Sequence, residues 1–382
     1  MHHPPSLNRR TFIKESVATG VGLVAGLRAA TLGGVARADG FTARVALTKG
    51  PDRADNAFRA LQMFKKEIAA AIGNKRVIIK PNFVWYSTGL ACTHVSFTEG
   101  ILEFLKSIGK RDVAIAESSA QSNTMAAFDT LGYWSLTRRY PVKVMDLNQE
   151  GSAGVQIWRY GDISNTAMQT IRVSKMLLNP NNFMISAAPL KTHNTVVATL
   201  STKNIAMSAP LIDIGNAFGS QSGSVNDKPT MHGPTGAPTN TNKTYADYQV
   251  LNDNVYRLVK VYGVRPHLAV LDGYQGMQGE GPVSGTAVGT PQQLALASLD
   301  FLAADRVALA LMGSNVNVPL GNTGQPFPAC LNYLWQAGLG EWDLNNIEVL
   351  GQPIAGNVYN YTAHSYQTAG YETVNIRSTP RD

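Results

Sequence analysis

The sequence of 382 residues predicts an α/β fold with a mainly parallel, helix-covered sheet. From residue 43 onward, short apolar runs of strand length alternate with longer segments of helical period. Several runs, such as VIIK, VAIA and LAVL, are apolar without alternation, which is typical of strands covered on both faces. The chain is 44% hydrophobic and 15% charged, so it can bury a large core. We expect one α/β domain over residues 43–351, with two lobes as an open alternative, and a C-terminal tail over residues 352–382.

Each expected strand is a short apolar run that ends at polar or Gly residues. These runs cover residues 77–80, 113–117, 142–147, 183–188, 268–272, 294–298 and 347–350. The segments between them place apolar residues three and four positions apart, as amphipathic helices do. The expected helices cover residues 54–72, 98–108, 124–140, 252–262, 301–312 and 328–337.

A long polar loop insertion interrupts this alternation at residues 213–247, which are mostly Gly, Asn, Thr and Pro. A loop of this length inside a compact domain is usually a lid, a binding loop or a disordered insertion. A functional lid and a plain insertion both remain open.

The first 38 residues resemble a twin-arginine signal peptide. Arg9 and Arg10 precede Phe12, a weakly apolar Gly/Ala-rich stretch follows, and residues 36–38 read Ala-Arg-Ala, a small-x-small cleavage site. The alternative is a stray arginine pair in an amphipathic helix. The signal predicts the twin-arginine translocase as a partner and a periplasmic or secreted location. No stretch reaches the roughly 18 to 20 apolar residues of a spanning helix, so we expect no integral membrane anchor in the mature chain.

Charge and cysteine content narrow the function classes. Of the 33 Lys and Arg, five lie in the first 38 residues, which hold one of the 26 Asp and Glu. The remaining chain is only mildly basic, so we expect no nucleic-acid partner. Cys92 and Cys330 are too few for a disulfide framework or for a four-cysteine zinc or iron–sulfur site. One disulfide stays open.

Polar residues follow five of the expected strands at their carboxyl ends. In an open parallel sheet, ligands bind beyond these ends, where loops and helix N-termini converge. Any one such residue is more often a cap or a turn. All five together predict a shared site, formed by the segments Lys80-Pro81-Asn82, Glu117-Ser118-Ser119, Asp146, Lys191-Thr192-His193 and Asp272-Gly273.

The densest segment runs from Lys191 to Asn204. We expect a helix from near Thr195, whose N-terminus beside lysines suits a carboxylate or phosphate. In a straight helix Lys203 lies on the order of 12 Å from that start, so Lys191 and Lys203 meet one small ion only if the helix is broken or crosses. The catalytic candidates are His193 as acid or base with Lys191 and Lys80, and the substrate-binding candidates are Asn82, Lys203, Asn204 and Glu117.

A divalent metal is a second candidate ligand for this edge of the sheet. The candidate ligands are His193, His232, Asp272 and Glu280, the last two within the Gly-rich segment LDGYQGMQGEGPVSGT. No two histidines have a short metal-ligand spacing, so distant residues would have to assemble the site. The chain has no Walker loop, no dinucleotide fingerprint and no nucleophile elbow.

An ordered set of motifs resembles the domain of unknown function family 362. The motifs are Lys80-Pro81-Asn82, Lys191-Thr192-His193, Lys203-Asn204, Lys228 to His232, Leu271-Asp272-Gly273, Gly279-Glu280-Gly281-Pro282, Ala297-Ser298-x-Asp300, Ala304-Asp305 and Gly338-Leu339-Gly340. The resemblance covers roughly residues 43–351 and implies no settled reaction. Some family members carry ferredoxin-type cysteine runs and are described as iron–sulfur proteins. This chain has no such run, so the resemblance implies no iron–sulfur cluster here.

Two functions are consistent with these residues. The first is an exported enzyme that acts on a small anionic substrate, a carboxylate or phosphate, by lysine anion binding and by His acid/base or metal-assisted chemistry. The second is a non-catalytic periplasmic accessory protein that holds a ligand or a metal for a partner.

Overall fold

The computed structural model describes residues 40, 42–159, 167–213, 226–232, 245–314, 319–320, 325–326, 329–365, 377 and 379–381. The expected signal peptide and most of the expected loop at residues 213–247 lie outside the described residues.

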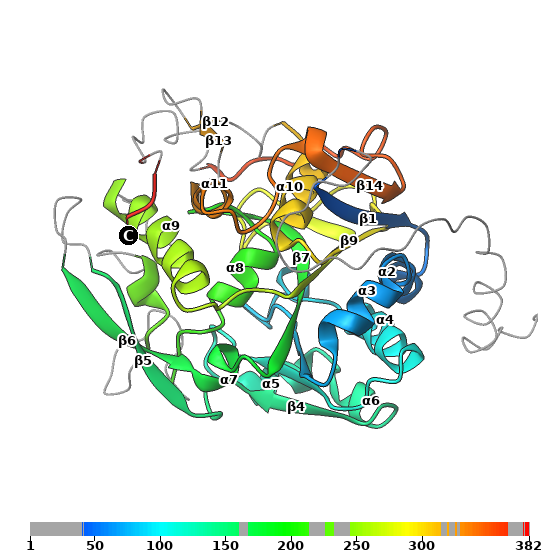
Figure 1. The fold of residues 1–382 in the computed structure, drawn as a ribbon, viewed down its shortest axis with the longest axis horizontal. Coiled ribbons are helices and arrows are strands. Elements are labelled where there is room, and N and C mark those ends of the chain that lie inside the picture. Colours follow the sequence, from blue (N-terminus) through cyan, green and yellow to red (C-terminus); the bar gives the residue numbers. More distant parts are fainter. Residues whose placement is uncertain are drawn as a thin grey trace, which may run out of the picture. The chain divides into compact units, whose positions relative to one another are not determined.

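A ten-stranded sheet runs through the described part of the chain (Figure 1). Its main path has the order β14-β1-β11-β9-β7-β2-β3-β4, while β8 pairs with β7 and β10 with β9. Five of the seven neighbouring pairs on the path are parallel, and β11 is antiparallel to both β1 and β9. The strands are β1 (Ala43–Lys49), β2 (Arg76–Lys80), β3 (Val113–Glu117), β4 (Val142–Asp146), β7 (Asn182–His193), β8 (Val197–Thr199), β9 (Leu268–Gln278), β10 (Thr286–Ala287), β11 (Leu294–Ser298) and β14 (Ile347–Gly351).

Helices cover both faces of this sheet (Figure 1). One face packs against α2, and α2 packs against α4. Apolar residues of α8, α9, α10 and α11 join one core cluster with the other face, including Leu47, Leu271 and Leu296. The fold class predicted from the sequence is confirmed. The helices are α2 (Arg53–Gln62), α3 (Lys65–Ile72), α4 (Val95–Ser107), α5 (Thr124–Thr130), α6 (Trp134–Thr137), α7 (Lys175–Leu178), α8 (Ser201–Ala206), α9 (Tyr245–Lys260), α10 (Phe301–Met312) and α11 (Ala329–Gln336), with 3-10 turns at Gly89–Ala91, Pro229–His232 and Leu344–Asn346.

Several elements differ from the prediction. The expected helix at residues 54–72 is two helices, α2 and α3, which meet at Met63 and Phe64. The expected helix at residues 124–140 also divides, because Gly132 adopts a φ of 76° after α5. Strand β1 was not predicted from the sequence, nor was the separate hairpin of β5 (Ser152–Trp158) and β6 (Met168–Ser174). A two-stranded pair of β12 (Pro319–Leu320) and β13 (Gln325–Pro326) was missed as well.

The described residues from 42 onward form one compact unit rather than two lobes. The described part of the expected tail packs on this unit. Tyr361 is fully buried, and its N–H donates to the carbonyl of Met312 at 2.7 Å.

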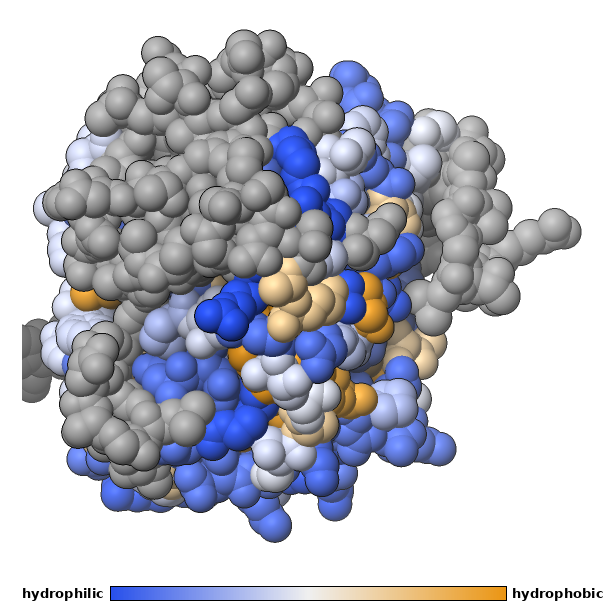
Figure 2. Space-filling view, turned by 90° about the vertical axis from the view of Figure 1, so that its left-hand side faces the viewer, coloured by the Kyte–Doolittle hydropathy of each residue, from blue (hydrophilic) through white to orange (hydrophobic). Residues whose placement is uncertain are grey.

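Figure 2 shows one side of the molecule, where the described surface is mostly hydrophilic around a small hydrophobic group. Large hydrophobic side chains that are exposed lie scattered along the described chain, at Met63, Met125, Val261, Trp335 and Val358. None of the helices in the described ranges combines the length and the apolar character that a membrane crossing requires.

Candidate functional site

The carboxyl end of β2 places a lysine inside the protein. Lys80, the last residue of β2, is paired in register with Ser186 of the neighbouring β7. Its side chain is only 4% exposed. The Nζ atom donates to Asn204 Oδ1 at 2.7 Å and lies 3.0 Å from Glu117 Oε2. Lys80 therefore joins strand β2, strand β3 and helix α8.

Two asparagine amides continue this set of contacts. Asn204 Oδ1 also accepts from Asn82 Nδ2 at 2.9 Å, so one oxygen receives hydrogen bonds from two side chains. Asn204 Nδ2 donates to the carbonyl of Lys80 and to Ser186 Oγ, at 3.1 and 3.0 Å. Because both ends of the Asn204 amide are engaged, its oxygen is fixed toward Lys80.

Lys191 of β7 meets the same asparagine pair from the other end. It is fully buried, and its Nζ donates to Asn82 Oδ1 at 2.7 Å. Its other acceptors are the carbonyls of Ala91, at 2.6 Å, and Pro282, at 3.5 Å. Lys191 thus links three separate segments to β7. Each of its three N–H groups donates to an uncharged oxygen.

Glu117 and Lys228 complete the cluster. Glu117 Oε2 accepts from the N–H of Phe83 at 2.7 Å, in addition to its contact with Lys80. Ser118 Oγ, next along the chain, accepts from Lys228 Nζ at 2.8 Å. Lys228 also donates to the carbonyl of Met207 at 2.9 Å. We call the following seven residues the lysine network: Lys80, Asn82, Glu117, Ser118, Lys191, Asn204 and Lys228.

Burial changes the acidity of these groups. It lowers the pKa of both Lys191 and Lys228 to about 7. Burial also lowers the pKa of Lys80, against the opposing attraction of Glu117. The thiol of Cys92, close enough to interact with Lys191, has its pKa raised by burial to about 11 and stays neutral. The network therefore holds amines that exchange protons near neutral pH.

The prediction that a helix starts near Thr195 is wrong. Strand β7 continues to His193, and the chain turns back as β8, which pairs antiparallel with β7. Helix α8 begins only at Ser201. The β-branched residues of the segment Thr195 to Thr199 suit a strand, which explains the difference.

The N-terminus of α8 is already occupied by a carboxylate of the chain itself. Asp305 of α10 accepts from the N–H groups of Ser201 and Thr202, at 2.8 and 2.9 Å, and from Thr202 Oγ1 at 2.6 Å. The anion that we expected at a helix N-terminus in this region is therefore an aspartate side chain.

Lys203 lies on α8 one residue before Asn204, but it is less buried than the lysines of the network. Its side chain is half-buried, and its charge is among those that lower the pKa of Lys228. Lys203 therefore lies close enough to Lys228 to interact with it electrostatically.

His193 and Asp272 serve other local contacts. His193 Nδ1 accepts from the N–H of Thr195 at 2.9 Å, which holds the turn between β7 and β8. Asp272 is buried and lies 3.5 Å from Arg53 Nε, and it accepts from the N–H of Tyr274 at 3.1 Å. Burial raises the pKa of Asp272.

The four candidate metal ligands do not come together. Glu280 is half-exposed and pairs with His364 Nε2 at 3.1 Å, and also with Ser365. His232 Nδ1 lies 3.1 Å from the carbonyl of Lys228. Across the described ranges, no three His, Cys, Asp or Glu side chains gather closely enough to hold a metal ion. The expected set of His193, His232, Asp272 and Glu280 is thus not assembled as one site.

Sequence reasoning missed Lys228 and Ser118 as members of the site. Ser118 belongs to a strand-end segment that the sequence did single out. Lys228 was harder to identify from the sequence. It lies in the motif Lys228 to His232, of which only His232 was proposed as a site residue. The network contains Lys80, Asn82, Glu117, Lys191 and Asn204 of the predicted set.

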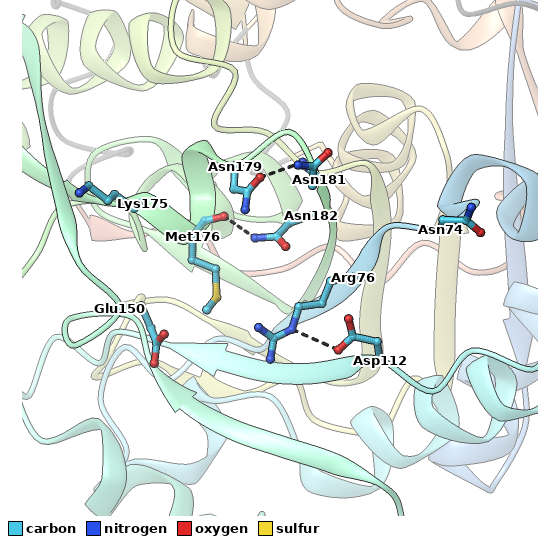
Figure 3. A pocket seen from close by; sticks show the side chains of 9 residues that line it. All are labelled: Asn74, Arg76, Asp112, Glu150, Lys175, Met176, Asn179, Asn181 and Asn182. Carbon is cyan, nitrogen blue, oxygen red and sulfur yellow. Dashed lines mark hydrogen bonds and ion pairs between the residues drawn. The ribbon is translucent and has the colours of Figure 1, made fainter.

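A separate open pocket lies at the amino ends of β2 and β7 (Figure 3). Arg76 and Asn182, the first residues of these strands, line it, and Arg76 lies 3.4 Å from Asp112. Lys175 and Glu150 add one charge of each sign. Because its charges balance, this pocket has no preference for an anion, unlike the lysine network toward the other ends of the strands.

The family model described as "Domain of unknown function (DUF362)" matches residues 77–310. A search of curated proteins found no match. Among solved structures, a crystal structure of a Thermotoga maritima protein matches with a TM-score of 0.38 and 12% identity, over 63% of this chain. The match spans 56% of the Thermotoga chain.

Proposed function

Since the chain belongs to the DUF362 family, a domain of unknown function, we propose its activity from the site alone: an exported enzyme that acts on a small anionic substrate. The substrate class is a carboxylate or a phosphate, and the lysine network is the binding site.

The balance of buried charge is the observation that supports this proposal. Three lysines of the network, Lys80, Lys191 and Lys228, are at most 3% exposed, whereas the network holds one carboxylate, Glu117, which contacts Lys80 directly. A buried charge is costly unless it is paired. An anionic ligand supplies the missing negative charge, and this makes its binding favourable.

Proton transfer is the catalytic part of the proposal. With a pKa of about 7, Lys191 holds or releases a proton at neutral pH, which is the property that a general acid or base requires. His193, two residues along β7, is the second candidate for this role.

A non-catalytic binding protein is the alternative, and one observation favours it. All three N–H groups of Lys191 meet protein oxygens, as expected of a residue that only fixes the site.

Calorimetry and turnover assays on the full chain test the proposal. Acetate or inorganic phosphate at 100 times its Kd should stabilise the fold by about 2.7 kcal/mol. The pH profile of turnover on phosphate monoesters, and on esters that carry a free carboxylate, should show a pKa near 7 that disappears in Lys191→Met. The matched control is Lys143→Met, because Lys143 is an exposed lysine of β4.

Two results would count against it. If neither anion binds, the lysine network is not an anion site. If an anion binds but no ester turns over, the binding-protein alternative is correct. If the pH profile is the same in Lys191→Met, Lys191 is not the acid or base.

We also propose export through the twin-arginine translocase, on the basis of Arg9, Arg10 and the residues that follow. The double variant Arg9→Lys, Arg10→Lys should leave the protein in the cytoplasm as an uncleaved precursor. Arg37→Lys, which keeps the pair, should be delivered normally. Fractionation followed by mass measurement of the product distinguishes these outcomes, and delivery of the double variant would contradict the proposal.

A further inference from the structure

Two lysines of the network have hydrogen-bonding capacity that the protein does not use. An ammonium group has three N–H donors. Among the described residues, Lys80 Nζ meets two acceptors, Asn204 Oδ1 and Glu117 Oε2. Lys228 Nζ also meets two, Ser118 Oγ and the carbonyl of Met207. Each of these lysines keeps one N–H for another partner, whereas Lys191 does not.

These two lysines lie on either side of one short segment. Lys80 contacts Glu117, and Lys228 contacts the next residue, Ser118. Their mutual repulsion is among the causes that lower the pKa of Lys228, so the two ammonium groups are near each other. The other charged groups that interact with Lys228 are Glu117, Asp146 and Lys203.

Two buried hydroxyls next to the network also lack partners. Thr199 Oγ1 and Ser201 Oγ have no hydrogen-bond partner within the described structure, and both residues are at most 3% exposed. Thr199 lies opposite Lys191 in the β7–β8 pair, and Ser201 lies one helical turn before Asn204. A buried hydroxyl is normally hydrogen-bonded, so these atoms indicate a polar partner at this position.

The charge of that partner follows from the groups in contact. The three ammonium groups of the network and the carboxylate of Glu117 leave an excess of two positive charges when all are ionised, and Lys203 and Asp146, which carry opposite charges, do not change this balance. Asp146, the next carboxylate, directs Oδ1 at Asn148, with contacts of 3.0 and 2.8 Å. A singly charged anion leaves one buried charge uncompensated, whereas a doubly charged one compensates both.

We propose that Lys80 and Lys228, rather than Lys191, together bind a doubly charged oxyanion of the phosphate type. This inference rests on the proposed function and adds the substrate class and a residue, Lys228, that the sequence did not assign. A tetrahedral oxyanion has separate oxygens for two ammonium groups and for nearby hydroxyls.

Lys228→Met is the informative variant. Glu117 keeps its contact with Lys80 in this variant, so the carboxylate of the network keeps its direct ionic partner. Lys80→Met would remove that partner from Glu117, and a failure to fold would then hide the effect on binding.

Isothermal titration of the full chain with inorganic phosphate, sulfate and acetate at equal ionic strength tests the inference. Phosphate and sulfate should bind more tightly than acetate. Lys228→Met should weaken phosphate binding on the order of 10- to 100-fold, the usual effect of losing one charge-assisted hydrogen bond. Lys228→Arg should restore most of the affinity, and Lys143→Met should leave it unchanged.

The possible failures are distinguishable. Acetate binding as tight as that of phosphate, or full phosphate affinity in folded Lys228→Met, would overturn the dianion site while the proposed function stands. Binding of none of the three anions would overturn both.

Discussion

Lys191 and Lys228 are amines placed where water cannot reach them. Burial lowers the pKa of each to about 7, from about 10.4 in an unfolded chain. Above pH 7 the folded state therefore binds fewer protons than the unfolded state, so the free energy of unfolding rises with pH. Two buried thiols lower the free energy of unfolding as the pH rises above about 8.5. Burial raises the pKa of Cys92 to about 11 and of Cys330 to about 12, so these thiols keep protons in the folded state that they lose in the unfolded state.

We predict that the free energy of unfolding rises by about 3 kcal/mol between pH 7 and 8.5, where the two lysines dominate. Urea denaturation at the two pH values, without added anions, measures this change. The double variant Lys191→Met, Lys228→Met should lose most of the rise, because methionine does not titrate. An equal rise in the double variant would show that other groups cause it.

The same anion that binds the lysines should reduce this pH dependence. A bound dianion favours the charged ammonium groups, so it raises their pKa toward the unfolded value. Proton binding and anion binding are thus linked at these two residues.

Helix α8 is too short to be stable alone, since it has six residues. It nevertheless carries Asn204, and Met207 at its C-cap accepts from Lys228. Asp305 fixes the start of α8 through three hydrogen bonds. The position of the site therefore depends on a carboxylate of α10 about a hundred residues away.

Replacing Asp305 by alanine should cost about 2 to 4 kcal/mol of stability, because it leaves two buried N–H groups and a hydroxyl without a partner. Asp305→Asn keeps one acceptor oxygen and should lose less. Thermal unfolding measures both changes. Burial raises the pKa of Asp305 to about 7, so the folded state binds more protons than the unfolded state below this pH. The wild type therefore gains stability from Asp305 as the pH falls, whereas asparagine does not titrate. The deficit of the asparagine variant should be largest at low pH and shrink as the pH rises through about 7, and the same deficit at every pH would contradict the role of this carboxylate.

The segment from Tyr361 to His364 packs against the α/β unit. Tyr361 is fully buried, and its hydroxyl donates to Gln292 Oε1 at 2.5 Å. The N–H of Gly279 donates to the carbonyl of Thr362 at 2.8 Å, and His364 contacts Glu280. These contacts join the segment to the Gly-rich loop after β9, which also supplies the Pro282 carbonyl to Lys191.

Tyr361→Ala should destabilise the protein by about 3 to 5 kcal/mol, as large-to-small substitutions of buried aromatic residues do. Tyr361→Phe should cost about 1 to 3 kcal/mol, since it removes only the partner of Gln292. Chemical denaturation gives both values. If the alanine variant matches the wild type, this segment contributes little to the stability of the fold.

Much of the sheet could be predicted from local sequence. The runs that form β2, β3, β7, β9 and β11 are continuous and apolar, and such runs identify buried strands without knowledge of their partners. The antiparallel direction of β11 could not be predicted, because direction depends on how the connections cross the sheet. The β5–β6 hairpin was missed because its residues mix exposed and buried positions. Strand β1 was missed because the polar residues Arg44 and Thr48 interrupt its apolar run.

Local sequence also identified Lys80, Asn82, Glu117, Lys191 and Asn204, because polar residues at the ends of apolar strands are unusual and parallel strands bring those ends together. It could not identify Lys228 as a partner of Ser118, or Asp305 as the cap of α8. Each of these pairs joins residues about a hundred positions apart, and such contacts arise only when the elements pack. His193, Asp272 and Glu280 each make different local contacts for the same reason. The hydrogen-bond partners of a side chain are the groups that the folded chain brings near it.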